Sequence, residues 1–133
     1  MDYGFFQIRL AKIEEFEYMG RIESSGIKIV EPLGYLDFLR VMSGAKLVLT
    51  DSGGLQEETT ALSIPCLTLR ENTERPITIE IGTNQLVGVD PDAVRKAAFE
   101  ILDGGFDISN AKIPPLWDGK TAERICDALI DVS

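Results

Sequence analysis

The alternation of short apolar runs with amphipathic segments is the feature that most restricts what this chain can fold into. The run Lys46–Thr50 is apolar after its first residue, and similar runs follow at Cys66–Leu69 and Gln85–Val89. Continuous apolar runs suit strands that are buried on both faces, as in parallel sheets. A further strand is predicted at Ile27–Val30, where β-branched residues precede Pro32.

Helical periodicity fills the intervals between these runs. Apolar residues at the i, i+3, i+4, i+7 spacing predict helices over Tyr35–Met42, Val94–Ile101 and Ala122–Leu129. A further helix is predicted over Gly54–Leu62 from its position directly after a strand. Asp90 suits the N-cap of the helix over Val94–Ile101 and Pro91 its first position. Thr121 is the predicted cap of the helix over Ala122–Leu129.

The remaining segments are assigned from local signals. Ile8–Tyr18 contains neither Pro nor Gly and is predicted to be a helix that Gly20 and the cluster at residues 24–26 end. The polar segment Arg70–Thr83 is predicted to be a loop. The whole pattern indicates an α/β fold with a doubly wound parallel sheet of about four strands, in one domain spanning residues 1–133.

Composition excludes several classes of function. The chain of 133 residues has a net charge of −9, which opposes binding to nucleic-acid backbones and to anionic membranes. It contains no histidine, and Cys66 and Cys126 are far apart, so no metal site is expected and both thiols are predicted to be reduced and buried. No apolar stretch is long enough to span a bilayer and no signal peptide is recognisable, so a cytoplasmic location is the default expectation.

One candidate binding site lies where the strand predicted at Lys46–Thr50 meets the helix that follows it. Ser52, Gly53 and Gly54 follow that strand directly. Glycines allow a ligand to approach the backbone, and a helix N-terminus offers unpaired N–H groups with partial positive charge. Phosphate is the natural ligand of such a site, although a plain strand-to-helix turn has the same pattern.

Charged residues nearby add candidates of the same kind. Glu57 and Glu58 follow on the same helix, where one of them can accept ribose hydroxyls and the other faces solvent. Arg75 lies in the polar segment after the next strand and hence at the same edge of the sheet. A guanidinium there can contact phosphate oxygens, whereas the simpler interpretation is a charged surface loop.

Taken together in order, these motifs resemble the non-hydrolysing UDP-N-acetylglucosamine 2-epimerases. The resemblance rests on five stretches and covers the chain from about Ile27 to its end: residues 31–35 (EPLGY), 49–58 (LTDSGGLQEE), 70–76 (RENTERP), 82–84 (GTN) and 117–122 (WDGKTA). Residues 1–26 depart from the pattern. The resemblance implies the carboxyl-terminal, UDP-binding domain of two Rossmann-like domains arranged as in the GT-B fold.

The resemblance also implies roles for single residues. Phe38 is expected against the uracil, although it also fits a core position, and Glu58 is expected to take the ribose hydroxyls. Ser52 and Gly53, with Gly54 beside them, are expected at the diphosphate, and Arg75 at the phosphate region. The expected ligand is UDP or a UDP-sugar, with no cofactor and no metal.

The family interconverts UDP-GlcNAc and UDP-ManNAc by eliminating UDP and adding it back. The carboxylates and the histidine that assist this chemistry are expected outside this segment, in an amino-terminal domain, so no catalytic residue is assigned and no turnover by this chain alone is expected. A separate amino-terminal domain is therefore a possible partner. The alternatives are a non-catalytic nucleotide-sugar binding module, a fragment like a GT-B glycosyltransferase, and a remnant with only a structural role.

Overall fold

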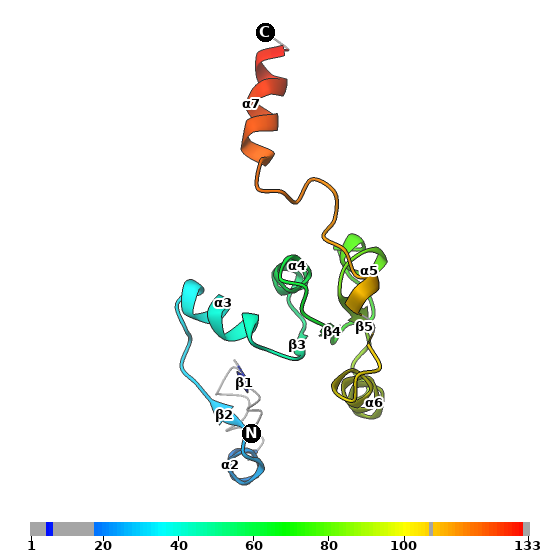
Figure 1. The fold of residues 1–133 in the computed structure, drawn as a ribbon. Helices are drawn as coiled ribbons and strands as arrows, with labels where there is room; N and C mark the ends of the chain where they lie inside the picture. The colour runs from blue at the N-terminus through cyan, green and yellow to red at the C-terminus, as the bar shows by residue number, and fades with distance from the viewer. Residues whose placement is uncertain (1–4, 7–17, 107, 132–133) are drawn as a thin grey trace. The chain divides into compact units, whose positions relative to one another are not determined.

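A computed structural model describes residues 5–6, 18–106 and 108–131 of the chain. The chain forms two compact units, Met1–Arg40 and Val41–Ser133. Figure 1 shows the order of the elements along the chain. The expectation of one domain over residues 1–133 stays a prediction.

The first unit contains a pair of short parallel strands. β1 (Phe5–Phe6) pairs with β2 (Lys28–Ile29), and Phe5 lies opposite Lys28. α2 (Met19–Ser25) precedes β2 and ends at Gly26, whose φ of 78° is the left-handed conformation that glycine adopts without strain. The expectation that Gly20 ends a helix is wrong, because that residue lies inside α2. The helix expected at Ile8–Tyr18 lies, except for its last residue, outside the described residues.

The second unit is organised around a three-stranded parallel sheet. β3 (Val48–Thr50), β4 (Cys66–Thr68) and β5 (Asn84–Leu86) lie in the order β3–β4–β5. Val48 is opposite Cys66, and Cys66 is opposite Asn84. The predicted α/β class with parallel strands is confirmed.

The helices between the strands begin close to the predicted positions. α3 (Tyr35–Ser43) starts in the first unit and ends in the second, α4 (Gly53–Ala61) follows β3, and α6 (Pro91–Leu102) follows β5. The Asp90 carboxylate accepts a hydrogen bond of 3.0 Å from the N–H of Ala93, which confirms the predicted cap. α7 (Thr121–Asp131) also begins where the sequence predicts a helix start.

The segment expected to be a loop contains a short helix. α5 (Ile77–Glu80) lies between β4 and β5. Pro76 precedes it with a φ of −57°, close to the helical value that its ring imposes. The Thr78 hydroxyl donates to the Arg75 carbonyl at 2.7 Å, which supports the first turn. A 3₁₀ turn at Ile108–Asn110 was not predicted either.

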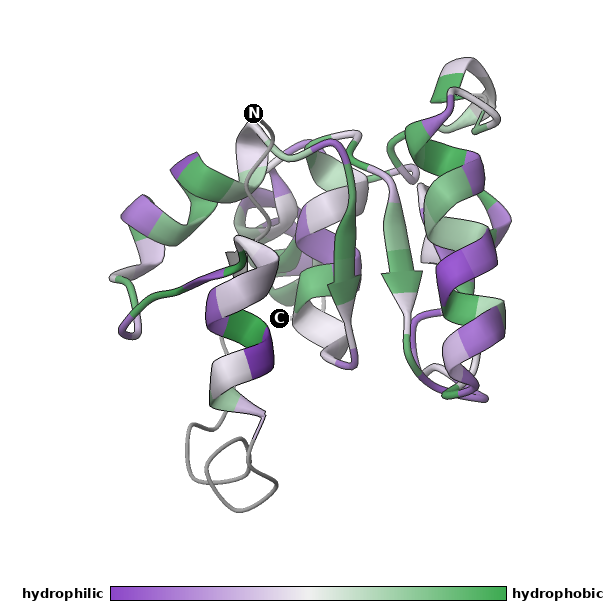
Figure 2. Ribbon diagram, turned by 90° about the horizontal axis from the view of Figure 1, so that it is seen from below, coloured by the Kyte–Doolittle hydropathy of each residue, from purple (hydrophilic) through white to green (hydrophobic). Residues whose placement is uncertain are grey.

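The buried centre of the second unit has two faces. α4 and α5 lie on one side of the β3–β4–β5 sheet and α6 on the other (Figure 1). β3 and β4 are coloured as hydrophobic over most of their length, whereas the helices carry alternating hydrophobic and hydrophilic bands (Figure 2). The most buried hydrophobic residues are Met42, Ile64, Cys66, Leu67 and Ile101. Unlike a typical amphipathic helix, α4 buries only Gln56, Thr59 and Thr60.

The two cysteines differ in environment. Both are free thiols, as predicted, but Cys66 is buried whereas Cys126, on α7, is exposed. Burial raises the pKa of the Cys66 thiol, and hydrogen bonds with Thr59 and Thr68 oppose that shift. The expectation that both thiols are buried is therefore wrong for Cys126, because α7 buries none of its side chains.

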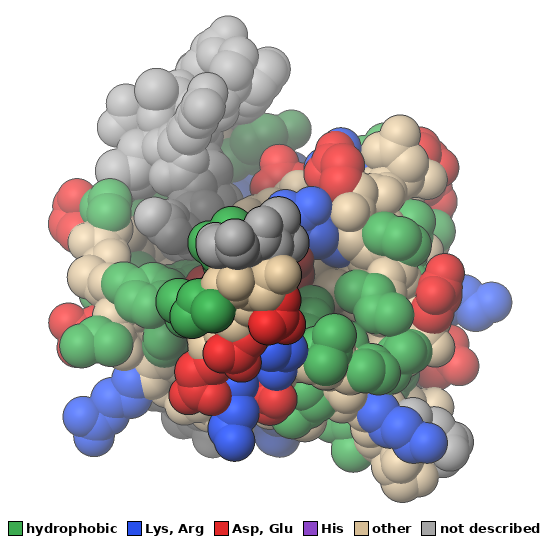
Figure 3. Space-filling view, turned by 90° about the horizontal axis from the view of Figure 1, so that it is seen from above, with side chains coloured by type: hydrophobic (Ala, Val, Ile, Leu, Met, Phe, Trp, Pro, Cys, Tyr) green, Lys and Arg blue, Asp and Glu red, His purple; other side chains and the backbone are tan. Residues whose placement is uncertain are grey.

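Within the described ranges, no helix combines the length and the apolar character needed to cross a membrane. On the face seen in Figure 3, acidic and basic side chains are interspersed with hydrophobic ones.

Candidate functional site

The turn between β3 and α4 leaves the start of the helix open to a ligand. Ser52 is the N-cap in an extended conformation (φ −85°, ψ 126°), and its side chain makes no capping hydrogen bond. Its N–H instead donates to the Thr50 hydroxyl at 3.0 Å. The first N–H groups of α4 therefore lack the usual side-chain acceptor, which is the arrangement that binds anions at helix N-termini.

The two glycines of this turn keep the space above it free. A Cβ placed on Gly53 would meet only a carboxylate oxygen of Glu74 at 3.8 Å, and one on Gly54 only the Ser52 hydroxyl at 3.9 Å. These are ordinary contact distances, so the glycines are not demanded by packing within the chain. Their value is the access that they give to the backbone N–H groups.

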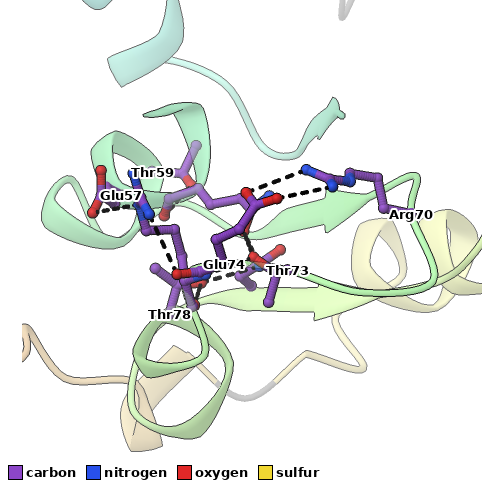
Figure 4. Close-up of polar contacts among 9 residues, drawn as sticks. Glu57, Thr59, Arg70, Thr73, Glu74 and Thr78 are labelled. Carbon is purple, nitrogen blue, oxygen red and sulfur yellow. Dashed lines mark hydrogen bonds and ion pairs between the residues drawn. The ribbon is translucent and has the colours of Figure 1, made fainter. Parts of the chain in front are cut away.

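The loop after β4 brings charged side chains to the same place. Arg70 Nη2 lies 3.1 Å from Glu74 Oε1 and also donates to Asn72 Oδ1 at 3.4 Å. Figure 4 shows the Arg70 guanidinium facing the Glu74 carboxylate. The hydrogen bond from Arg70, followed by its charge, lowers the pKa of Glu74. The Glu74 carboxylate thus lies beside Gly53, where a bound phosphate would compete with it for the same position.

The Arg75 side chain is partly exposed and forms an ion pair with a residue of α4. Its Nε lies 2.9 Å from Glu57 Oε1, with the two side chains 42% and 41% exposed. The Nε–H does not align with that oxygen as a hydrogen bond would, so the contact is an ion pair. Arg75 Nη1 donates to the Glu74 carbonyl at 3.3 Å. The sequence pattern did not identify Glu57 as the partner of Arg75.

A buried group of polar side chains lies beneath this loop, and we name Gln56, Thr68, Thr73, Thr78 and Asn84 the Gln56–Asn84 cluster. Thr73 donates to Gln56 Oε1 at 2.5 Å, and Asn84 Nδ2 donates to the same oxygen at 3.3 Å and to the Thr78 hydroxyl at 3.1 Å. The Thr68 hydroxyl donates to Asn84 Oδ1 at 2.6 Å. Gln56, Thr68 and Thr78 are fully buried and Asn84 is 3% exposed.

This cluster escaped sequence reasoning because its members look unremarkable one by one. Thr and Asn are common in loops and caps, and hydrophobic periodicity gives a buried Gln no weight. The sequence carries one signal for the cluster. The helix predicted at Gly54–Leu62 lies between two predicted strands but has no apolar stripe. Such a helix must be held by hydrogen bonds instead.

A hollow of about 520 Å³ opens at the carboxyl ends of β4 and β5. It is lined by Arg70, Glu71, Leu86, Val87, Gly88, Asp90 and Ala93. Gly88 has a φ of 68°, and a Cβ there would lie 2.6 Å from a carboxylate oxygen of Glu71. The positive φ favours glycine at this position, whereas the Glu71 carboxylate, at the end of a flexible exposed side chain, could move aside. No group of three or more residues suited to a metal occurs in the described part of the chain.

The predicted site residues divide between the two units. Ser52, Gly53, Gly54, Glu58 and Arg75 belong to the unit Val41–Ser133, around the start of α4 and the loop that follows β4. The structure places Glu58 half-buried on α4, next to the Glu57 that pairs with Arg75.

Phe38 belongs to the unit Met1–Arg40, where it is half-buried on α3. Its predicted place against a uracil stays a prediction, as do the ligand roles of the other five residues.

Comparison with known proteins gives one consistent result. The sequence model of the family described as UDP-N-acetylglucosamine 2-epimerase matches residues 8–130. A curated relative, UDP-N-acetylglucosamine 2-epimerase from Methanocaldococcus jannaschii, is 45% identical over 115 residues, which are 86% of this chain and 30% of the relative. The chain thus spans about a third of the length of that protein.

Solved structures agree with the sequence comparison. The crystal structure of the Methanocaldococcus jannaschii epimerase in complex with UDP-GlcNAc and UDP has a TM-score of 0.75 and 42% identity, covering 96% of this chain and 35% of that one. The epimerase from Neisseria meningitidis bound to UDP-GlcNAc has a TM-score of 0.77 and 28% identity, covering 96% of this chain and 36% of that one.

Proposed function

The chain belongs to the UDP-N-acetylglucosamine 2-epimerase family, and from that membership we propose that it is the carboxyl-terminal part that binds the UDP of UDP-GlcNAc and UDP-ManNAc. The observation that carries the proposal is the uncapped N-terminus of α4, whose two glycines leave the backbone accessible. A diphosphate is the ligand whose charge and size match a row of N–H groups beside a guanidinium.

Each predicted residue has a place in this proposal. Ser52, Gly53 and Gly54 hold the diphosphate through the hydroxyl and the N–H groups that the helix leaves unused. Glu58, one turn further along α4, accepts the ribose hydroxyls. Arg75 contacts the phosphate oxygens.

Phe38, in the unit Met1–Arg40, is the residue that we propose to stack on the uracil and so to supply the base preference. An aromatic ring suits this role because its flat face packs against a planar base.

Local charge offsets the unfavourable field of the whole chain. The net charge of −9 opposes an anionic ligand at long range. The positive end of α4 and the Arg75 guanidinium act at contact distance, where they outweigh distant charges that salt screens. Binding requires Arg75 to exchange part of its contact with Glu57 for the phosphate, so the ion pair lowers the net gain.

The catalytic contribution follows from the family's chemistry. Elimination of UDP develops negative charge on the leaving diphosphate, and donors aimed at that charge stabilise the transition state. Proton transfer at the sugar requires acids and bases that we assign to the part of the relatives that this chain does not span. We expect the chain alone to bind UDP without turning over UDP-GlcNAc.

Calorimetric titration tests the binding proposal. UDP should bind saturably, and inorganic phosphate and ADP should bind much more weakly. Arg75→Ala should weaken UDP binding by about 10- to 100-fold, the usual loss for one charge-assisted contact. Arg95→Ala is the matched control, because Arg95 pairs with Asp92 at the surface of α6, and it should bind UDP like the parent chain. Equal affinities for UDP and phosphate, or an unchanged Arg75→Ala variant, would contradict the proposal.

A further inference from the structure

The Gln56–Asn84 cluster has no role in the binding scheme above, yet it lies directly beneath it. Three elements each contribute one buried residue: Gln56 comes from α4, Thr68 ends β4, and Asn84 begins β5. The remaining two members come from the loop after β4 and from α5. The cluster therefore joins the sheet to the segment that carries Arg75.

Both backbone polar groups of Arg75 are bound to members of this cluster. Its N–H donates to the Thr73 hydroxyl at 3.0 Å, and its carbonyl accepts from the Thr78 hydroxyl at 2.7 Å. Thr73 in turn donates to Gln56 Oε1, and Thr78 accepts from Asn84 Nδ2. Two chains of hydrogen bonds thus run from buried amides to the two sides of one residue, and Figure 4 shows Thr73 and Thr78 within this network.

Gln56 also contributes to the other half of the site, through its backbone. The N–H of Gln56 donates to the Ser52 carbonyl at 3.3 Å, so Gln56 belongs to the first turn of the helix that offers its N-terminus. One residue therefore contacts the end of α4 through its backbone and the Arg75 loop through its side chain. The position of Arg75 relative to the N-terminus of α4, the two proposed phosphate contacts, therefore depends on Gln56.

Gln56 Oε1 accepts two hydrogen bonds, but the nitrogen of the same amide is not satisfied within the described part of the chain. Gln56 is fully buried, and its Nε2 has no hydrogen-bond partner among the residues that the structure describes. An unpaired buried N–H costs free energy, and an apolar side chain of similar length would avoid that cost. The Gln56 amide instead restrains the positions of its partners Thr73 and Asn84, because hydrogen bonds fix geometry more narrowly than apolar contacts do.

We propose that Gln56 and Asn84 are positioning residues that hold Arg75 at a fixed place relative to the N-terminus of α4. They act through Arg75 and do not touch the ligand. The inference rests on the proposed function for its binding consequence, but the positioning itself is a property of the free chain.

The first measurement needs no ligand. Gln56→Met keeps the length of the side chain and removes the acceptor for Thr73. Hydrogen exchange of the Arg75 backbone N–H, followed by NMR, should become clearly faster in this variant, while amides in β4 keep their protection. Thr59→Val is the matched control: Thr59 is equally buried on α4, but its hydroxyl donates to the carbonyls of Leu55 and Gln56 in its own helix. It should leave the exchange of Arg75 unchanged.

The second measurement separates positioning from general destabilisation. Gln56→Met should weaken UDP binding by about 3- to 30-fold in the parent chain and should have no further effect in an Arg75→Ala background, because coupled residues are not additive. Gln56→Glu keeps the acceptor oxygen when its carboxyl group is neutral. This variant should therefore retain most of the affinity that Gln56→Met loses. If Gln56→Met does not fold, Thr73→Val, at a half-buried position, replaces it in the binding measurement only, because it removes the donor to Gln56 Oε1 and also the direct acceptor of the Arg75 N–H.

The outcomes are distinguishable. Faster exchange at Arg75 with a non-additive loss of affinity supports the proposal. Unchanged exchange at Arg75, or an equal loss of affinity in the Arg75→Ala background, overturns it. A chain that binds no UDP at all contradicts the proposed function, and the exchange measurement then still decides whether Gln56 positions Arg75.

Discussion

The β3–β4–β5 sheet meets polar side chains on one face and apolar side chains on the other. Cys66 and Thr68 point toward α4, since Cys66 contacts Thr59 there. Leu67 points to the opposite face, where α6 lies and buries Ile101. The same strand therefore contributes to two kinds of packing within three residues.

The two faces of the sheet differ in how precisely they must hold the elements packed against them. Apolar burial stabilises the sheet but has no direction, so it tolerates small shifts of α6. The α4 face carries the start of a helix and the Arg75 loop, whose atoms must keep a set distance from a ligand. Hydrogen bonds from Gln56 and Asn84 provide that restraint at the expense of some stability.

Leu67→Ala should give the largest change in the free energy of unfolding, a loss of about 2–5 kcal/mol, because it opens a cavity at a fully buried position. Urea denaturation followed by circular dichroism measures it. The Arg75 amide should exchange as in the parent chain at low denaturant, where the variant is still folded. A selective change at Arg75 would show that the apolar face also controls the loop, and the distinction between the faces would fail.

Thr68→Val should have a smaller effect, a loss of about 1–3 kcal/mol, because it removes the donor to Asn84 Oδ1 without changing the volume of the side chain. The same denaturation experiment applies. Unlike Leu67→Ala, this variant should also speed up exchange at Arg75. If the variant were as stable as the parent chain, the polar face would not depend on its hydrogen bonds.

Glu57→Gln should have the smallest effect and the opposite sign for binding. Removing the charge frees Arg75 from an exposed ion pair, so UDP should bind up to about fivefold more tightly, within the usual range for such pairs. Titration calorimetry at low salt measures it. Glu80→Gln, on α5, is a control for the change in net charge alone. Weaker binding in Glu57→Gln would mean that Glu57 orients Arg75 instead of competing with the phosphate.

The apolar face was predictable and the polar face was not. The runs at β3 and β4 and the stripe on α6 are visible because burial of apolar side chains leaves a trace in the sequence. The strand predicted at Gln85–Val89 only overlaps β5 (Asn84–Leu86), whose buried residue is the polar Asn84. α4 was predicted only from its position after β3. Its buried Gln and Thr residues acquire meaning only when Asn84, distant in sequence, is placed beside them.

The candidate site shows the same division. The glycines after β3 were identifiable because a glycine-rich strand-to-helix turn has a physical meaning by itself. The partner of Arg75 was not, because two adjacent glutamates on one helix cannot be ranked without the position of the loop. The short helix α5 was missed for a related reason: its four residues are too few to show a period.

The contrast between the two thiols makes the chain a convenient spectroscopic tool. Cys66 is buried and has a raised pKa, which keeps it protonated and out of reach, whereas Cys126 on α7 is open to reagents. A maleimide dye will therefore attach to α7 alone without any engineered substitution. The single tryptophan, Trp117, precedes that helix and can serve as the energy-transfer donor. Changes in α7 on addition of a partner domain then become visible as a change in tryptophan fluorescence.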